Sequence, residues 1–205
     1  FWVPSMSAVI PLKLQYADVN GAPYITKPVM PTNQKLRIGL RWQGNPEFEH
    51  EQHRLFPSQK LFDSVKDIDA DFISLQRDEG SEHRPEWAKE VPLQSWGETQ
   101  CAIASCDLVI TSCTSVAHLS AAMGVETWII VPVLPYYLWA KAGDTTEWYD
   151  SVKLFRQTTY ENWDKPFAQI REQLNSLGDN DGDKDRVLDT SRKWGSEGVL
   201  GHAAA

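Results

Sequence analysis

The sequence lacks the marks of several protein classes. Its three cysteines, at positions 101, 106 and 113, have no CxxC spacing, which predicts reduced thiols rather than a disulfide framework. It has no apolar run near the ~18 residues that a membrane-spanning helix needs. Its net charge of −8 excludes the basic surface that is typical of nucleic-acid-binding proteins. We therefore expect a cytoplasmic protein without a nucleic-acid partner.

Common catalytic and metal motifs are also missing. There is no GxGxxG, no P-loop lysine and no GxSxG. The HEQH at residues 50–53 is one residue short of the zinc motif HExxH. The acidic run at 179–185 resembles a calcium loop, but with Gly182 at the glycine position its first and last ligands would be Leu177 and Leu188. We expect neither a bound metal nor a cofactor.

Apolar runs and amphipathic stretches alternate along the middle of the chain. The predicted strands cover residues 35–42, 71–76, 108–111, 126–132 and 152–156. The predicted helices cover residues 58–68, 97–106, 114–123 and 163–177. This alternation is typical of an α/β fold with a Rossmann-like, doubly wound parallel sheet. We expect the sheet domain to span 35–177 and to be followed by a polar, flexible tail at 178–205.

The polar residues of interest follow the predicted strands. In parallel α/β sheets, ligands bind beyond the carboxyl ends of the strands. Because the strands are parallel, the loops after four of them should meet at one edge. These loops are residues 43–46, 76–78, 111–115 and 132–135.

The junction at residues 107–119 is the most informative of these. A short β-branched run leads straight into a helix, and Thr114 or Ser115 can cap that helix through a side-chain oxygen. The unpaired N–H groups and the dipole of the first turn favour an anion such as a diphosphate. His118 lies four residues after Thr114, so it shares that helix face. A plain capped turn with a packed histidine is the alternative.

Three further residues have two interpretations each. Gly44 directly follows a strand, where it can let a ligand approach the backbone or simply form a turn. Arg54 can pair with a phosphate or lie solvated on the surface. Gln76 ends a predicted strand, and its amide can bind a base or ribose or cap the strand end.

An ordered series of segments resembles the donor half of family 9 glycosyltransferases, the heptosyltransferase-like enzymes that are often fused to tetratricopeptide repeats. The series comprises RIGLRWQGNP at 37–46, HR at 53–54, SLQ at 74–76, DLVI at 107–110, TSVAHL at 114–119, EWY at 147–149 and KLFRQ at 153–157. The resemblance implies the C-terminal, donor-binding domain of a GT-B glycosyltransferase. Residues 1–34 would then be the end of the acceptor domain and the interdomain connection, and most of the acceptor domain would lie upstream of Phe1.

The resemblance also implies roles for particular residues. The donor loop would contain Gln43, Gly44 and Asn45, and Gln76 would lie at the same edge. The diphosphate would face Arg54, Thr114 and Ser115, with His118 close behind. Cys113 departs from the family, which usually has Asp at that position.

The activity implied is metal-independent, inverting transfer from a nucleotide-diphosphate sugar to a glycan, lipid or protein acceptor. The catalytic residue is not identified, because the family's base is expected in the acceptor domain. Two alternatives stay open. One is a non-catalytic nucleotide-sugar-binding or interaction module, and the other is a nucleotide-sugar epimerase on the same fold.

Overall fold

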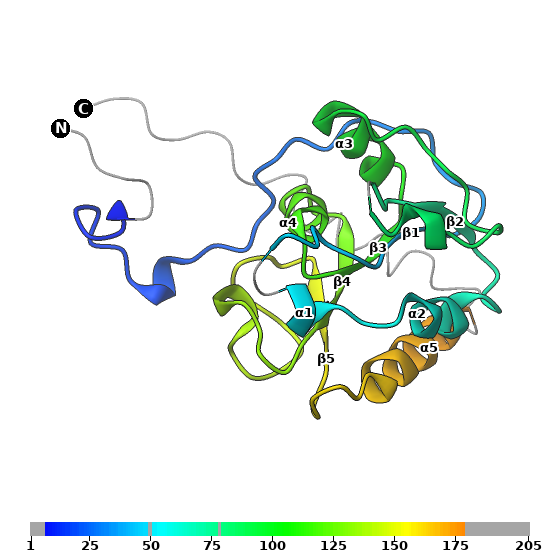
Figure 1. Ribbon diagram of the computed structural model, residues 1–205. Helices are drawn as coiled ribbons and strands as arrows, with labels where there is room; N and C mark the ends of the chain where they lie inside the picture. Colours follow the sequence, from blue (N-terminus) through cyan, green and yellow to red (C-terminus); the bar gives the residue numbers. More distant parts are fainter. Residues whose placement is uncertain (1–6, 49–50, 78, 179–205) are drawn as a thin grey trace.

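Five parallel strands form one sheet, in the order β2-β1-β3-β4-β5, in the computed structural model of the chain (Figure 1). The structure describes residues 7–48, 51–77 and 79–178. The strands are β1 Arg37–Arg41, β2 Asp71–Ser74, β3 Leu108–Ser112, β4 Glu126–Val131 and β5 Val152–Arg156. All five lie at the predicted places and every pairing is parallel, which confirms the α/β, Rossmann-like sheet.

Helices cover both faces of this sheet (Figure 1). One face packs against α2 Ser58–Val65 and α5 Asp164–Gly178, and the other packs against α3 Trp96–Ala104 and α4 Ser115–Ala122. Side chains alternate between the two faces along each strand, so Leu108 and Ile110 of β3 enter the first core and Val109 enters the second. This double-sided burial explains why the strands are nearly continuous apolar runs.

The start of α3 and the end of α4 have residues that are typical of helix ends. Ser95 caps α3, because its hydroxyl accepts the Glu98 N–H at 3.2 Å and the Glu98 carboxylate accepts the Ser95 N–H at 3.0 Å. Gly124 follows α4 with a φ of +72°, a left-handed conformation that favours glycine at this position. A one-turn helix, α1 Glu51–Arg54, was not predicted, because four residues are too short to show a helical period.

The segment before the sheet runs along the domain and then projects from it (Figure 1). Its later part is attached by the N–H groups of Tyr24 and Ile25, which donate to Ala122 O at 2.9 and 3.0 Å. Its earlier part exposes large apolar side chains, including Ile10 at 76% and Leu12 at 65%. Within the described residues, no helix has both the length and the apolar character that crossing a bilayer requires. Of the tail predicted at 178–205, Gly178 is the last residue of α5, and residues 179–205 lie outside the described residues.

Candidate functional site

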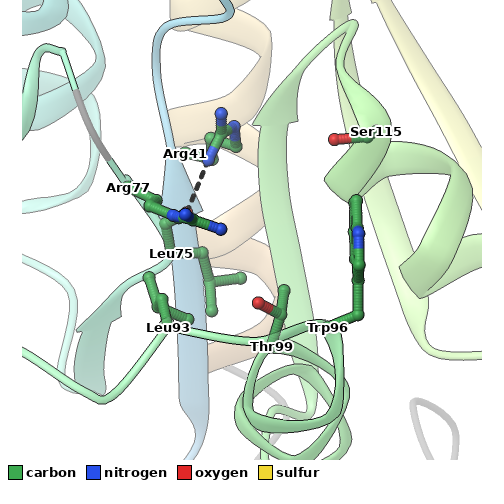
Figure 2. Close-up of a pocket in the computed structure, with 7 residues that line it drawn as sticks. All are labelled: Arg41, Leu75, Arg77, Leu93, Trp96, Thr99 and Ser115. Atoms are coloured by element: carbon green, nitrogen blue, oxygen red, sulfur yellow. Dashed lines mark hydrogen bonds between the residues drawn. The ribbon is translucent and has the colours of Figure 1, made fainter.

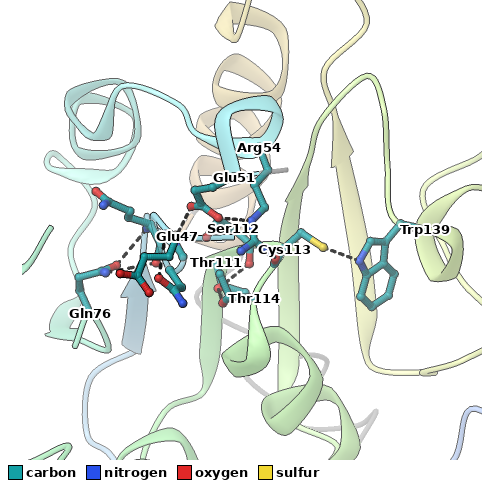
Figure 3. A network of polar contacts seen from close by, with 12 residues as sticks. Glu47, Glu51, Arg54, Gln76, Thr111, Ser112, Cys113, Thr114 and Trp139 are labelled. Carbon is teal, nitrogen blue, oxygen red and sulfur yellow. Dashed lines mark hydrogen bonds and ion pairs between the residues drawn. The ribbon is translucent and has the colours of Figure 1, made fainter. Parts of the chain in front are cut away.

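The chain leaves β1 and β3 toward opposite faces of the sheet. After β1 it passes through α1 to α2 on one face, and after β3 it enters α4 on the other. Because β1 and β3 are neighbours, their carboxyl ends form the crevice where ligands bind in doubly wound sheets. Gly44 and Arg54 both contact Glu51 here, and Arg54 also reaches Cys113, which directly precedes Thr114. Figure 3 shows Glu51, Arg54 and Thr114 in this region.

A carboxylate that was not predicted from the sequence lies at the centre of the polar network in Figure 3. Glu51 is 4% exposed and its Oε1 accepts the Gly44 N–H at 2.8 Å. Its Oε2 pairs with Nε of Arg54. The only sequence signal for this residue was its place in the rejected HEQH motif, and a single glutamate in a polar loop does not indicate burial.

Arg54 reaches from α1 to the end of β3. Its Nη1 donates to the carbonyl of Cys113, and its guanidinium carbon lies 4.7 Å from the centre of the Phe48 ring. The side chain is 18% exposed, so the interpretation of Arg54 as a solvated surface residue is wrong. The predicted proximity of Arg54 to the start of α4 is confirmed, because Cys113 directly precedes the N-cap Thr114.

The absence of a side chain at Gly44 has a structural reason here. A Cβ atom at this position would lie 2.6 Å from Oε2 and 2.9 Å from Oε1 of Glu51. The loop can therefore donate its N–H to the carboxylate only because the residue is glycine. The neighbouring Asn45 is exposed, and its side chain accepts the Glu47 N–H at 2.9 Å within the same turn.

Gln76 caps the end of β1. Its Oε1 accepts the N–H groups of Trp42 and Gln43 at 3.2 and 3.0 Å, and its Nε2 donates to the carbonyls of Gln43, Arg77 and Glu79. The side chain is buried and its amide is fully occupied. The prediction that Gln76 binds ligand is therefore corrected to the structural alternative, and Gln43 is held by the same amide.

Thr114 occupies the predicted N-cap position of α4, but its hydroxyl makes no capping hydrogen bond. The hydroxyl lies 3.4 Å from Oγ1 of Thr111 instead, and Ser115 is exposed as the first residue of the helix. The prediction of a side-chain cap is wrong, because the buried Thr111 hydroxyl holds the Thr114 side chain. In the first turn of α4 the Ala117 N–H donates to the carbonyl of Thr114 at 3.0 Å, whereas the N–H groups of Ser115 and Val116 have no acceptor among the described residues.

Ser112 is a second buried polar residue that the sequence analysis missed. It is 2% exposed, and its hydroxyl has no hydrogen-bond partner within the part of the chain that the structure describes. Strand alternation places it on the same face as Ile110, the face from which α1 approaches (Figure 3). A buried hydroxyl without a partner is costly, which is typical of a site that takes a water or a ligand.

A cavity of about 130 Å³ lies beside the crevice, on the α3 and α4 side of the sheet (Figure 2). Two arginines, Arg41 and Arg77, lie on one side of it and the ring of Trp96 and the hydroxyl of Ser115 on the other. Leu75, Leu93 and Thr99 complete the lining. Trp96 is 64% exposed, so its ring is accessible to a planar ligand. Of these residues, Ser115 alone was predicted from the sequence to bind ligand.

Cys113 and His118 belong to an aromatic cluster on the β4 side. The Cys113 sulfur accepts the indole N–H of the fully buried Trp139 at 2.8 Å, and burial raises the pKa of its thiol. The thiol is therefore uncharged near neutral pH. The His118 ring stacks on Trp139 at 5.2 Å, and its Nδ1 lies 3.1 Å from the hydroxyl of Tyr149. His118 is therefore packed among aromatic side chains, as in the alternative interpretation of this histidine.

The burial of His118 predicts a pH dependence of stability. Burial lowers the pKa of His118 below its usual value of 6.5, so the unfolded chain binds a proton that the folded chain does not. The free energy of unfolding should therefore fall as the pH drops through about 6.5. Urea unfolding at several pH values should show a weaker acid dependence in His118→Asn than in wild type. The exposed His83 provides the control His83→Asn, and parallel curves for all three proteins would contradict this role.

Within the described ranges, no group of three or more His, Cys, Asp and Glu side chains is arranged to hold a metal ion. His50 of the HEQH motif lies outside those ranges. Comparison of the chain with models of protein families, with curated proteins and with solved structures finds no match. Its function must therefore be inferred from the site itself.

Proposed function

We propose that this chain is the donor-binding domain of a family 9-like GT-B glycosyltransferase and that it holds a nucleotide-diphosphate sugar across the β1–β3 crevice. One observation carries the proposal. The uncapped start of α4, the guanidinium of Arg54 and the cavity beside Trp96 adjoin one another at the carboxyl edge of a parallel sheet.

The diphosphate is assigned to the start of α4. First-turn N–H groups and the helix dipole favour an anion there, and no side-chain cap competes for them. Arg54 adds a positive charge with directed N–H donors. The chain carries a net charge of −8, so its overall field does not attract an anion and these local donors must hold it.

The nucleoside is assigned to the cavity. Trp96 offers an aromatic surface for stacking a base, and Leu75 and Leu93 provide apolar walls. Ser115 belongs both to the first turn of α4 and to the cavity lining. A ligand that has an aromatic ring at one end and phosphates at the other therefore spans the two sites.

The proposed reaction is direct displacement at the anomeric carbon with inversion and without a metal. The donor domain would orient the sugar and stabilise the charge on the leaving diphosphate. The acceptor, a glycan, lipid or protein, would bind to a separate domain that supplies the base.

A second candidate is a non-catalytic nucleotide-sugar-binding module. It is favoured by Cys113, whose buried, uncharged thiol accepts from Trp139 where family 9 enzymes usually carry a carboxylate.

Calorimetric titration with a panel of ADP, GDP, UDP and TDP tests the proposal. At least one should bind, and binding should persist in EDTA. Trp96→Ala should weaken that ligand by about 1–3 kcal/mol, the usual contribution of stacking a base on an aromatic ring. Trp96→Phe should keep most of the affinity because a phenyl ring still stacks. The proposal would be refuted if the folded protein bound no member of the panel. Its metal-free form would be refuted if binding strictly required a divalent ion.

A further inference from the structure

A buried carboxylate controls the arginine of the proposed diphosphate site. Glu51 is on the same turn of helix as Arg54, and its two oxygens join that arginine to the Gly44 loop. We propose that Glu51 is a positioning residue, which fixes the orientation in which Arg54 meets the phosphates. This inference rests on the proposed function and names the group that makes its site selective for phosphorylated ligands.

Three contacts hold the guanidinium of Arg54. Nε pairs with Glu51, Nη1 donates to Cys113 O, and the Phe48 ring covers one face of the guanidinium. A guanidinium is planar and rigid, so two held nitrogens also fix the third. Nη2 has no hydrogen-bond partner among the residues that the structure describes, and it lies where a Cβ added at Gly44 would meet it. The arrangement leaves one pair of directed donors for a ligand.

Stability alone does not require an ion pair here. Apolar side chains of similar volume often replace a buried ion pair without loss of stability. The charges of Glu51 and Arg54 also cancel, so the pair attracts anions less strongly than Arg54 alone would. The advantage that remains is geometric, because the same carboxylate holds the loop after β1 and the arginine that reaches β3.

In the opposite interpretation, Glu51 is an internal anion that competes with the phosphate for Arg54. The two interpretations predict opposite changes in diphosphate affinity when the carboxylate is removed. If the carboxylate competes, its removal should strengthen binding of a diphosphate. If it positions Arg54, its removal should weaken binding, because the amide of a glutamine at residue 51 turns an N–H donor toward either Nε of Arg54 or the Gly44 N–H.

The test is a double-mutant cycle with Glu51→Gln, Arg54→Gln and the combined variant. The nucleoside diphosphate that binds best to the wild type and the corresponding nucleoside are titrated into each by calorimetry. Glu51→Gln should weaken the diphosphate about tenfold or more, as for loss of one charged hydrogen bond, and leave the nucleoside unchanged. It should cause no further loss when Arg54 is already Gln, because Glu51 acts through that residue.

Two controls separate positioning from general effects. Glu47→Gln removes the same charge from an exposed position on the same loop and should leave both affinities unchanged. Glu51→Asp keeps the charge and should recover part of the diphosphate affinity that Glu51→Gln loses. Unchanged nucleoside binding shows in each variant that the neighbouring cavity is still folded.

Each outcome is decisive. The positioning role would be overturned if Glu51→Gln bound the diphosphate more tightly, or if it lost as much affinity for the nucleoside as for the diphosphate. It would also be overturned if Glu51→Gln lost the same diphosphate affinity when Arg54 is already Gln. These outcomes would leave the proposed function intact. Wild-type protein that binds no nucleoside diphosphate would overturn the proposed function, and this inference with it.

Discussion

Arg54→Ala is expected to lower the free energy of unfolding by about 3–5 kcal/mol, since it leaves the carboxylate of Glu51 buried without its partner. The carbonyl of Cys113 also loses its donor. In the folded variant, a nucleoside diphosphate should bind more weakly by about 1.5–3 kcal/mol, the contribution of a charged hydrogen bond. Urea unfolding measures the first effect and calorimetry measures the second.

Arg171→Ala is the matched control for the stability effect. Arg171 pairs with Asp67 at 2.7 Å, but the two side chains are 47% and 60% exposed. A pair exposed to this degree contributes about 0–1 kcal/mol. Adding Glu51→Ala to Arg54→Ala should recover stability, because no unpaired charge then stays buried. Equal losses for Arg54→Ala and Arg171→Ala would show that the Glu51–Arg54 pair is not buried in solution.

Gly44→Ala is expected to displace the loop after β1. The added methyl group would meet both oxygens of Glu51, at 2.6 and 2.9 Å, and these oxygens are held by their own partners. Overpacking of this kind costs about 1–3 kcal/mol of stability. Diphosphate binding should fall as well, because the loop and Arg54 share the Glu51 anchor. Unfolding experiments and calorimetry on the same variant measure both effects.

Gly97→Ala serves as the control for this substitution. Gly97 lies in α3, and a Cβ there would meet only Ser95 Oγ, at the ordinary distance of 3.9 Å. Alanine favours helix over glycine, so this variant should gain about 0.5–1 kcal/mol of stability. If Gly44→Ala instead keeps wild-type stability and affinity, the close approach of Glu51 to the loop does not exist in solution.

Local patterns predicted most of the architecture. Each strand was recognisable from a short apolar run, and the four longer helices from their periodicity and boundary residues. The predicted end of the helix at residue 123 is followed by Gly124 in a left-handed conformation. These signals are readable because they depend on neighbours only a few residues away. The parallel direction of the strands then followed from strand–helix alternation.

Side-chain roles were less predictable. Gln76 is a strand-end residue whose amide was a plausible ligand contact, yet it satisfies the loop after β1. Thr114 lies at the N-cap position, but its hydroxyl is held by Thr111. Trp96 belongs to no binding motif in the sequence, and it enters the candidate site because α3 begins beside the carboxyl ends of β1 and β2. In each case a partner from another element decided the outcome.

The sequence by itself determined an α/β chain whose polar loops gather at one edge of a parallel sheet, because hydrophobic periodicity is a local property that burial enforces on every strand and helix. Only the tertiary structure decided how those loops are joined. The sheet order placed β3 beside β1, which brought the carbonyl of Cys113 to Arg54 across 59 residues and enclosed Glu51 between them. A long side chain in a polar loop can reach many partners, and only the packed position of the strands selects one.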